Sequence, residues 1–359
     1  MNKRHYIIPI FVSHRGCPHD CVFCNQKKIT GQAGDVAPND MVEKIEEYLK
    51  TIPQENSFVE LAFYGGSFTA IPIYQQQGLL EAVQPYIAKG VISNIRISTR
   101  PDCIDLTVIE LLKAYNVRIV ELGVQSMDEE VLRLSNRGHS SQDVVDSVAL
   151  LKKHGFVVGV QVMVGLPGDT MEISIQTVER LIELKPDIAR IYPALVITNT
   201  YMEQMYYEGT YRPLTLEEAV ERCKWLLILF ERNNIEVIRI GLQPTENILE
   251  GKEVVAGPFH PSMRQLVVSA IYRDMMLYML KNAGSIEVLE IYVNPRDISD
   301  LLGQKRCNIE FLKAALKTDK ITVIQDISIP GNSLMMKYDE ITMNMSTKDF
   351  RKILEIGRN

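Results

Sequence analysis

A regular alternation of short apolar runs and helix-like segments constrains the fold of this chain more than any other feature. The runs that look like buried strands cover residues 6–12, 58–63, 92–97, 118–122, 156–164 and 188–193, with a seventh at 235–240. Apolar residues recur at helical spacing in residues 40–51, 74–87, 104–115, 141–154, 171–184 and 216–233. Because such alternation produces parallel βαβ units, we predict an α/β fold, a complete or partial (β/α) TIM-type barrel of six or so parallel strands.

The alternation weakens after about residue 241, where prolines and glycines mark a loop-rich stretch. Helical spacing returns near residues 262–282 and 310–317, and strand-like runs occupy 286–293 and 321–329. We therefore predict two domains, the barrel over residues 1–243 and a small α+β C-terminal region over residues 244–359, which covers the open side of the barrel or binds substrate. In a barrel of this type, the chemistry takes place at the carboxyl ends of the strands.

Three of the six cysteines fall within eight residues, in the loop directly after the first predicted strand. Cys17, Cys21 and Cys24 have the spacing C-x3-C-x2-C. Three thiolates suit an iron–sulfur cluster with one iron open to an outside ligand. The alternatives are three free thiols or a zinc site completed by His14 or His19, although the second pair of ligands usual in structural zinc sites is missing.

The cysteine spacing and the motifs downstream resemble the radical S-adenosylmethionine (radical SAM) superfamily. In that family, three cysteines hold a [4Fe-4S] cluster whose fourth iron binds S-adenosyl-L-methionine. An aromatic residue before the third cysteine packs near the adenine, a position that Phe23 matches. The family's Gly-Gly-acid turn after the second strand meets the methionine amino group, and Gly65, Gly66 and Ser67 match it, with serine in place of the usual acid.

By the same resemblance, the ends of the third, fourth and fifth predicted strands supply further contacts. Thr99, Arg100 and Gln125 are expected to contact cofactor or substrate, and Gly165 belongs to a Gly-Leu-Pro-Gly turn beside the adenine. Barrel topology brings these strand ends around one mouth. The predicted cofactor-binding residues are Phe23, Gly65, Gly66, Ser67, Thr99, Arg100, Gln125 and Gly165, and the predicted catalytic metal ligands are Cys17, Cys21 and Cys24.

The resemblance implies an enzyme that generates a 5′-deoxyadenosyl radical for hydrogen abstraction. The reduced cluster cleaves the cofactor, and an electron donor such as a flavodoxin or a ferredoxin reduces the cluster. The protein positions the cofactor and excludes water while the cofactor supplies the difficult chemistry. A noncatalytic iron–sulfur scaffold that kept the fold is the alternative from another functional class, and it would not require the glycine and strand-end motifs to remain intact.

Within the superfamily, the chain resembles the catalytic subunits of the elongator complex, which modify the wobble uridine of tRNA. The matching motifs lie at residues 98–102, 121–126, 136–139, 191–197 and 257–261, within a similarity that spans roughly residues 6–265. Full-length members of that family carry a C-terminal acetyltransferase domain, and the roughly 90 residues that follow here are too few for one. We expect a match to the radical half alone, so that a partner chain supplies the acetyl-CoA chemistry or the reaction differs.

The charge distribution bears on the substrate. The net charge of −6 argues against strong nonspecific binding of nucleic acid by the whole surface. The segment around the cysteines is basic, and Arg4, Arg15, Lys27 and Lys28 are either ordinary solvated charges or a patch near the barrel mouth for an anionic substrate. That substrate is tRNA by resemblance, and a small molecule such as a tetrapyrrole or an acyl thioester is the alternative.

The sequence also indicates where the protein acts. No apolar run reaches the roughly 18 residues of a membrane span, and the first residues do not form a signal-peptide core. Six cysteines are too few for a disulfide scaffold in a chain of this length. We expect a cytoplasmic protein without membrane partners, and nothing in the sequence specifies its oligomeric state.

Overall fold

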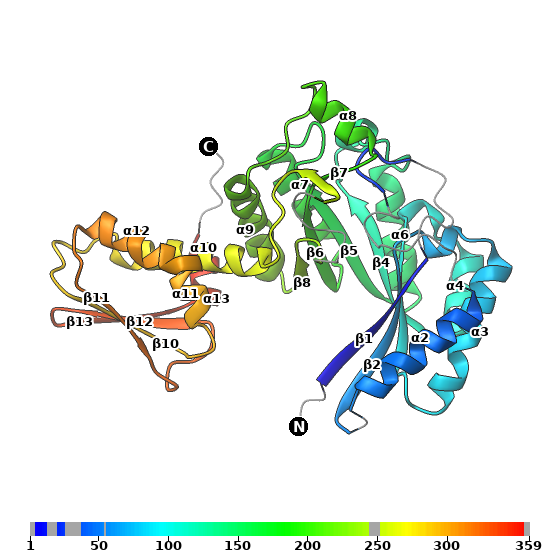
Figure 1. The fold of residues 1–359 in the computed structure, drawn as a ribbon, viewed down its shortest axis with the longest axis horizontal. Helices are drawn as coiled ribbons and strands as arrows, with labels where there is room; N and C mark the ends of the chain where they lie inside the picture. The colour runs from blue at the N-terminus through cyan, green and yellow to red at the C-terminus, as the bar shows by residue number, and fades with distance from the viewer. Residues whose placement is uncertain (1–3, 13–19, 26–36, 54, 244–251, 355–359) are drawn as a thin grey trace.

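A curled parallel sheet forms the larger part of the computed structural model, which describes residues 4–12, 20–25, 37–53, 55–243 and 252–354. Its seven strands follow the order β1-β2-β3-β4-β5-β6-β8 (Figure 1). They are β1 (Arg4–Phe11), β2 (Ser57–Tyr64), β3 (Asn94–Thr99), β4 (Val117–Gln125), β5 (Val157–Val164), β6 (Ile188–Pro193) and β8 (Glu236–Ile240). The sheet is a half-barrel with β1 and β8 at its two edges, which confirms the predicted partial (β/α) barrel.

Alternation within the strands separates an apolar face from a polar one. In β5, Val158, Val160, Val162 and Val164 are buried, whereas Gln161 between them is only half-buried. Successive side chains of a strand point to opposite faces, so the valines share one face and the glutamine lies on the other. β-branched residues suit such a packed sheet face, and the opposite face is free to carry polar groups toward the inside of the half-barrel.

Helices connect the strands and pack against them, as in other βαβ folds. Capping boxes start two of them, with Ser140 and Asp143 at one helix and Thr215 and Glu218 at the other. The connecting helices are α2 (Pro38–Thr51), α3 (Ile73–Ala88), α4 (Leu106–Ala114), α6 (Ser141–Lys153), α7 (Met171–Glu183) and α9 (Leu216–Arg232). Each lies within a few residues of a segment with the predicted helical spacing.

Short elements that the sequence did not predict lie around the cysteine loop. They are α5 (Glu129–Leu134), α8 (Tyr201–Tyr207), and a two-stranded pair of β7 (Val196–Ile197) and β9 (Val254–Ala256). Two backbone hydrogen bonds fix the loop, from Met202 N to Val22 O at 2.8 Å and from Val22 N to Ser135 O at 3.2 Å. Val22 also packs in an apolar cluster with Met202, Leu166 and Tyr211.

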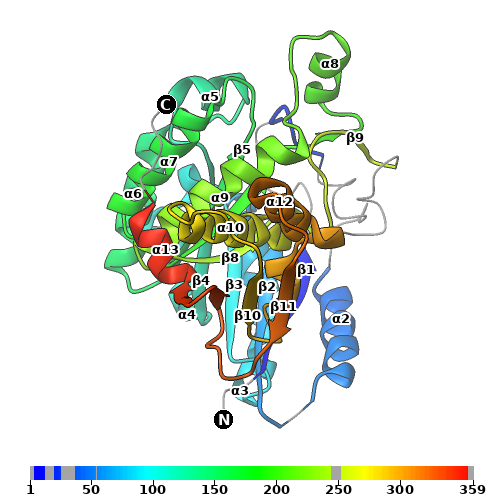
Figure 2. The same ribbon diagram turned by 90° about the vertical axis from the view of Figure 1, so that its left-hand side faces the viewer.

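The C-terminal region forms a second sheet, which Figure 1 places at the end of the molecule opposite α2 and α3. Its strand order is β11-β10-β12-β13, and only β10 and β11 pair in parallel. Figure 2 shows α10 crossing in front of the half-barrel, where it packs against α9 and β8. The elements are α10 (Met263–Leu280), β10 (Leu289–Val293), α11 (Ile298–Leu302), α12 (Cys307–Leu316), β11 (Ile321–Gln325), β12 (Ser333–Tyr338), β13 (Ile341–Ser346) and α13 (Thr347–Ile353). The expected boundary near residue 243 stays a prediction.

Candidate functional site

A cavity of about 720 Å³ lies inside the half-barrel and is lined by all seven strands or the loops that follow them. Sites for small molecules commonly measure roughly 300–1,000 Å³, so this cavity is large enough for a cofactor and part of a substrate. The predicted site residues that line it are Cys21, Cys24, Phe23, Gly65, Gly66, Ser67, Thr99, Arg100 and Gln125. Positions more than 100 residues apart in sequence are thus brought around one space.

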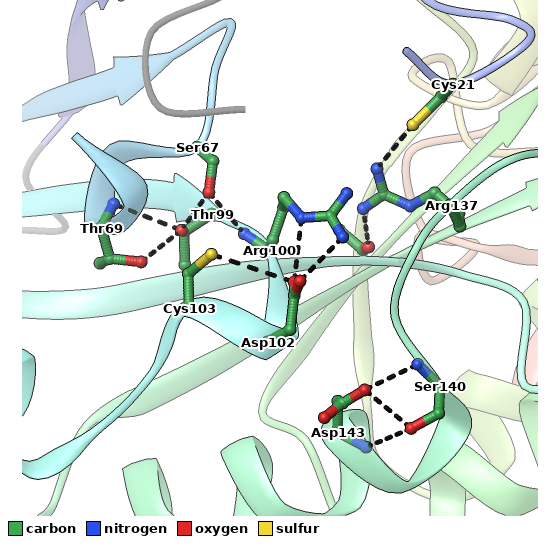
Figure 3. A network of polar contacts seen from close by, with 11 residues as sticks. Cys21, Ser67, Thr69, Thr99, Arg100, Asp102, Cys103, Arg137, Ser140 and Asp143 are labelled. Carbon is green, nitrogen blue, oxygen red and sulfur yellow. Dashed lines mark hydrogen bonds and ion pairs between the residues drawn. The ribbon is translucent and has the colours of Figure 1, made fainter. Parts of the chain in front are cut away.

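The cysteine loop borders this cavity. Cys21 is buried, Cys24 is half-buried, and neither forms a disulfide. The buried guanidinium of Arg137 donates one hydrogen bond to Cys21 Sγ at 3.3 Å and another to Gly123 O at 2.5 Å (Figure 3). Cys17 lies outside the described residues, and within them no cluster of three metal-ligating side chains forms.

A hydroxyl cluster joins the turn after β2 to the end of β3. Ser67 Oγ lies 2.9 Å from Thr99 Oγ1, and Thr69 Oγ1 lies 2.6 Å from the same atom. The backbone N–H of Arg100 donates to Ser67 Oγ at 3.2 Å (Figure 3). Gly65 adopts a φ of 86° at the start of this turn. Ser67, which stands where the family usually has an acid, therefore fixes the turn against β3.

Two other strand ends are held just as firmly. Arg100 forms a bidentate pair with Asp102, with Nε and a terminal nitrogen each 2.9 Å from a carboxylate oxygen. Gln125 ends β4 at a register shift and has a φ of 69°, which is unusual for a residue other than glycine. Its side-chain oxygen accepts a hydrogen bond from Gln161 at 3.3 Å. Backbone strain of this kind is often found at functional sites.

Gly165 is the one predicted cofactor residue that is not among those lining the cavity. Its N–H donates to Asp169 Oδ2 at 2.7 Å, and its carbonyl accepts from the Tyr211 hydroxyl at 2.6 Å. Asp169 also accepts from Ser174 and, at 3.0 Å, from Arg222. Burial is the main cause of the raised pKa of Asp169. The turn after β5 is thus anchored from behind by α7 and α9.

A ladder of buried charges crosses the inner face of the sheet, and the sequence-based prediction did not include it. Arg96 lies between two carboxylates, 2.8 Å from Glu60 and 2.9 Å from Glu121. Arg190 also pairs with Glu121, across the intervening strand β5. Burial by itself lowers the pKa of Arg190, but the Glu121 carboxylate together with Tyr192 and Tyr64 outweighs this effect and holds the pKa above the usual value.

A glycine in β5 makes the contact between Glu121 of β4 and Arg190 of β6 possible. Gly159 is the register partner of Glu121 on one side and of Ile188 on the other. A Cβ atom at Gly159 would lie 2.9 Å from Glu121 Cγ, so any larger residue would push the carboxylate away from Arg190. The sequence does hold a signal for the ladder, because charged residues alternate with apolar ones inside strands that otherwise look fully buried, as in β4 and β6.

Comparisons with known proteins agree with this geometry. The family model described as "Radical SAM superfamily" matches residues 11–181, and the one described as "Radical_SAM C-terminal domain" matches residues 186–273. The tRNA uridine(34) acetyltransferase of Methanocaldococcus infernus is 30% identical over 256 residues, which cover 60% of this chain and 48% of that protein. The chain thus spans about half the length of this relative.

Two further comparisons concern another relative and the fold. The heme chaperone HemW of Lactococcus lactis is 25% identical over 252 residues, which cover 68% of this chain and 64% of that protein. The structure of Elp3 from Methanocaldococcus infernus superposes with a TM-score of 0.62 at 24% identity, covering 77% of this chain and 64% of that one. This structural likeness supports the half-barrel fold.

The chain therefore belongs to the radical SAM superfamily, whose enzymes use a [4Fe-4S] cluster and S-adenosylmethionine. At the level of the superfamily, the family, the enzyme class and the cofactors expected from the sequence are confirmed. The described residues fit such a cluster, because Cys21 and Cys24 both line the cavity and sulfur is the ligand atom that iron–sulfur clusters take from proteins. The sulfur atoms of Cys21 and Cys24 stand here for the thiolate ligands.

One expectation about the mouth of the barrel is wrong. Arg4 begins β1, at the end opposite the cysteine loop, so the length of the strand separates it from the cavity mouth. Arg15, Lys27 and Lys28 lie outside the described residues.

None of the helices in the described part of the chain combines the length and apolar character needed to cross a bilayer.

Proposed function

We propose that this chain is a cytoplasmic radical SAM enzyme that modifies tRNA. One observation carries the catalytic part of the proposal, namely that two cysteines of the motif and seven of the eight predicted cofactor positions line one cavity. The choice of tRNA is supported by the similarity to the tRNA uridine(34) acetyltransferase. That similarity covers about half of the relative, so an acetyl transfer is not part of the proposal.

The residues of the chain have separate tasks in this proposal. Once bound, the cluster and S-adenosylmethionine supply one-electron cleavage of the cofactor and hydrogen-atom abstraction from the substrate. Cys21 and Cys24, together with Cys17, would hold three irons, and Arg137 would orient the Cys21 thiolate by its hydrogen bond. An electron donor such as a flavodoxin or a ferredoxin would supply the electron.

The fixed turns would hold the cofactor in one orientation. The hydroxyl cluster of Ser67, Thr69 and Thr99 leaves the turn after β2 little freedom to move, because three side chains and two backbone N–H groups share it. Gln125, held by Gln161, faces the same space from β4. Positioning by a rigid wall accelerates a reaction, since the reacting groups need not be ordered at the moment of reaction.

The test is anaerobic incubation of the reconstituted full chain with S-adenosylmethionine, dithionite and total cellular RNA. We expect RNA to stimulate the release of 5′-deoxyadenosine above an RNA-free control, and the stimulation to fall steeply with salt. A Cys21→Ala variant should release none. A Lys27→Glu/Lys28→Glu variant should lose the stimulation but keep the uncoupled release.

Two outcomes would contradict this function in different ways. If no 5′-deoxyadenosine forms either with RNA or in the RNA-free control, the chain is an iron–sulfur scaffold and not a catalyst. If 5′-deoxyadenosine forms but RNA neither stimulates it nor binds at low salt, the substrate is a small molecule. The similarity to a heme chaperone makes a tetrapyrrole the first compound to test in that case.

A further inference from the structure

The cavity has a second wall that contains none of the predicted cofactor residues. Strands β6 and β8 form it, and Arg190 and Arg239 are register partners on these neighbouring strands. Both side chains line the cavity. Like charges placed opposite one another on adjacent strands repel each other, so this arrangement needs compensating negative charge.

Arg190 receives its compensation from the protein. Its terminal nitrogen lies 3.1 Å from Glu121 Oε1, and its Nε pairs with the other oxygen of the same carboxylate. The ladder that continues from Glu121 through Arg96 to Glu60 contains two carboxylates and two guanidinium groups. The charge of Arg190 is therefore balanced within the ladder, and nothing in the ladder remains to balance Arg239.

Arg239 has no carboxylate partner among the described residues. Its one hydrogen bond runs from Nε to the carbonyl of Gly241 at 3.1 Å, which leaves both terminal nitrogens available. The side chain is half-buried. Burial is the main cause of the lowered pKa of Arg239, and the positive charge of Arg190 lowers it further. An arginine keeps its charge under these conditions, and a desolvated guanidinium without a counterion binds oxyanions well.

The opposite wall indicates what else the ligand carries. Ile7, Pro9 and Phe11 of β1 and Tyr48 of α2 line the same cavity and give this side an apolar character. The hydroxyl of Tyr192 lies on the cationic side, 3.4 Å from a terminal nitrogen of Arg190. A ligand that fills this space would place a negative group on the β6–β8 wall and an apolar or planar body against β1.

We propose that Arg239, assisted by Tyr192, binds an oxyanion of the substrate, either a phosphate or a carboxylate, while the remainder of that substrate lies against the apolar wall of β1. This subsite is separate from the predicted cofactor positions, which come from the cysteine loop and the ends of β2, β3, β4 and β5. The inference rests on the proposed function in taking the cavity as the reaction site, but the binding itself does not require the cluster.

The test measures binding of two probes to the full chain without cluster, at constant ionic strength. Uridine 5′-monophosphate presents a phosphate, and butyrate presents a carboxylate on an apolar tail. We expect Arg239→Gln to raise the dissociation constant of the preferred probe by about tenfold or more, since hydrogen bonds to a charged group are lost. Arg239→Lys should retain part of the affinity. Arg118→Gln, which removes the same charge from an exposed position on β4, should leave it unchanged.

The two probes distinguish the source of the oxyanion. Stronger binding of uridine 5′-monophosphate points to a nucleotide substrate, and stronger binding of butyrate points to a small acid. The proposal is overturned if the wild-type protein binds neither probe at millimolar concentration, or if Arg239→Gln binds both as well as the wild type does.

A second measurement covers the case in which Arg239→Gln does not fold. Phenylglyoxal should modify Arg239 of the wild-type protein faster than the ion-paired Arg96 and Arg190, and the preferred probe should slow that modification severalfold. Equal labelling of Arg239 with and without probe would overturn the proposal. Release of 5′-deoxyadenosine by the reconstituted enzyme tests the proposed function independently, so the two ideas can fail separately.

Discussion

The two larger sheets of the molecule differ in the side chains that they bury. In the C-terminal sheet, the side chains that β10 and β12 bury are all hydrophobic. They include Leu289, Ile291, Val293, Leu334 and Met336. In the half-barrel, β2, β3 and β4 bury Glu60, Arg96 and Glu121. A buried ion pair seldom adds stability compared with an apolar replacement, because both charges must first leave water. The half-barrel therefore carries an electrostatic cost that the C-terminal sheet avoids.

This difference indicates where the chemistry of the chain lies. The buried charges of this sheet adjoin the one cavity that both cysteines line, because Glu121 is among its lining residues, whereas the C-terminal sheet has the character of a packing element. Cysteines follow the same division. Cys21 faces a buried arginine at the cavity, and Cys307 is exposed at the start of α12. Substitutions in the two regions should therefore differ in kind and in size.

The largest difference should come from the cysteines. After anaerobic reconstitution, the wild type should bind about four irons, and Cys21→Ala should lose nearly all of them together with the brown chromophore. Cys307→Ala is the matched control and should keep the full iron content, because that thiol lies far from the motif in the C-terminal region. Iron and sulfide analysis and the visible absorbance measure both. Equal iron loss in the two variants, or one bound zinc in the wild type, would refute the assignment.

Removing one charge from the buried ladder should have the next largest effect. Glu121→Ala leaves both Arg96 and Arg190 without their shared carboxylate. Breaking a buried pair typically costs about 3–5 kcal/mol, and we expect a loss of that size in the free energy of unfolding. The control in the C-terminal region is Glu310→Ala, which breaks an exposed pair with Lys313 and should cost less than about 0.5 kcal/mol. Denaturant unfolding of both variants makes the comparison, and similar losses would contradict it.

Glycines provide a third comparison. Gly165 has a φ of 82°, and an added Cβ would lie 2.8 Å from the side chain of Leu214. Gly165→Ala should therefore destabilise the protein by about 1–3 kcal/mol, from backbone strain and overpacking together. Gly331 in the C-terminal region has no neighbouring atom within 4 Å of such a Cβ. Gly331→Ala should change stability by no more than about 0.5 kcal/mol, and thermal unfolding that shows equal shifts would disprove the expectation.

The half-barrel could be predicted from the sequence because its signals are local. Each strand is a short β-branched run, and each connecting helix shows regular apolar spacing, so β1 to β6 and their helices were found within a few residues. The pair β7 and β9 was missed because each strand is only two or three residues long and its partner lies more than 50 residues away. In β12 and β13, methionine, serine and asparagine give no clear strand pattern.

The residues of the candidate site also divide into those that the sequence predicts and those that only the structure reveals. Positions that match a motif, such as Ser67 and Gln125, were predicted by resemblance, and they line the cavity. The wall formed by Arg190 and Arg239 was not predicted, because the register of β6 against β8 decides that these two side chains meet. Gly165 shows the limit of a motif, since the turn that contains it was recognised correctly but its contacts run to Asp169 and Tyr211 behind the cavity.

The smallest expected difference concerns pH. His139 is buried just before α6 of the half-barrel, and the C-terminal region after residue 262 contains no histidine. Burial, followed by the positive charges of Arg137 and Arg100, lowers the pKa of His139 to about 3, and Asp102 opposes this only in part. The unfolded chain takes up a proton on this ring near pH 6.5, whereas the folded protein does not until near pH 3. The contribution to stability is therefore complete above pH 6.5 and is lost progressively as the pH falls. Between pH 7.5 and 5.5 the free energy of unfolding should drop by about 1.4 kcal/mol from this group alone.

His139→Phe should abolish that part of the pH dependence, and His154→Gln, at a half-buried histidine of the same half-barrel, should retain it. Denaturant unfolding at the two pH values measures the effect as a difference between variants, so the titration of other groups cancels. A wild-type drop that persists unchanged in His139→Phe would show that the ring does not stay neutral in the folded protein.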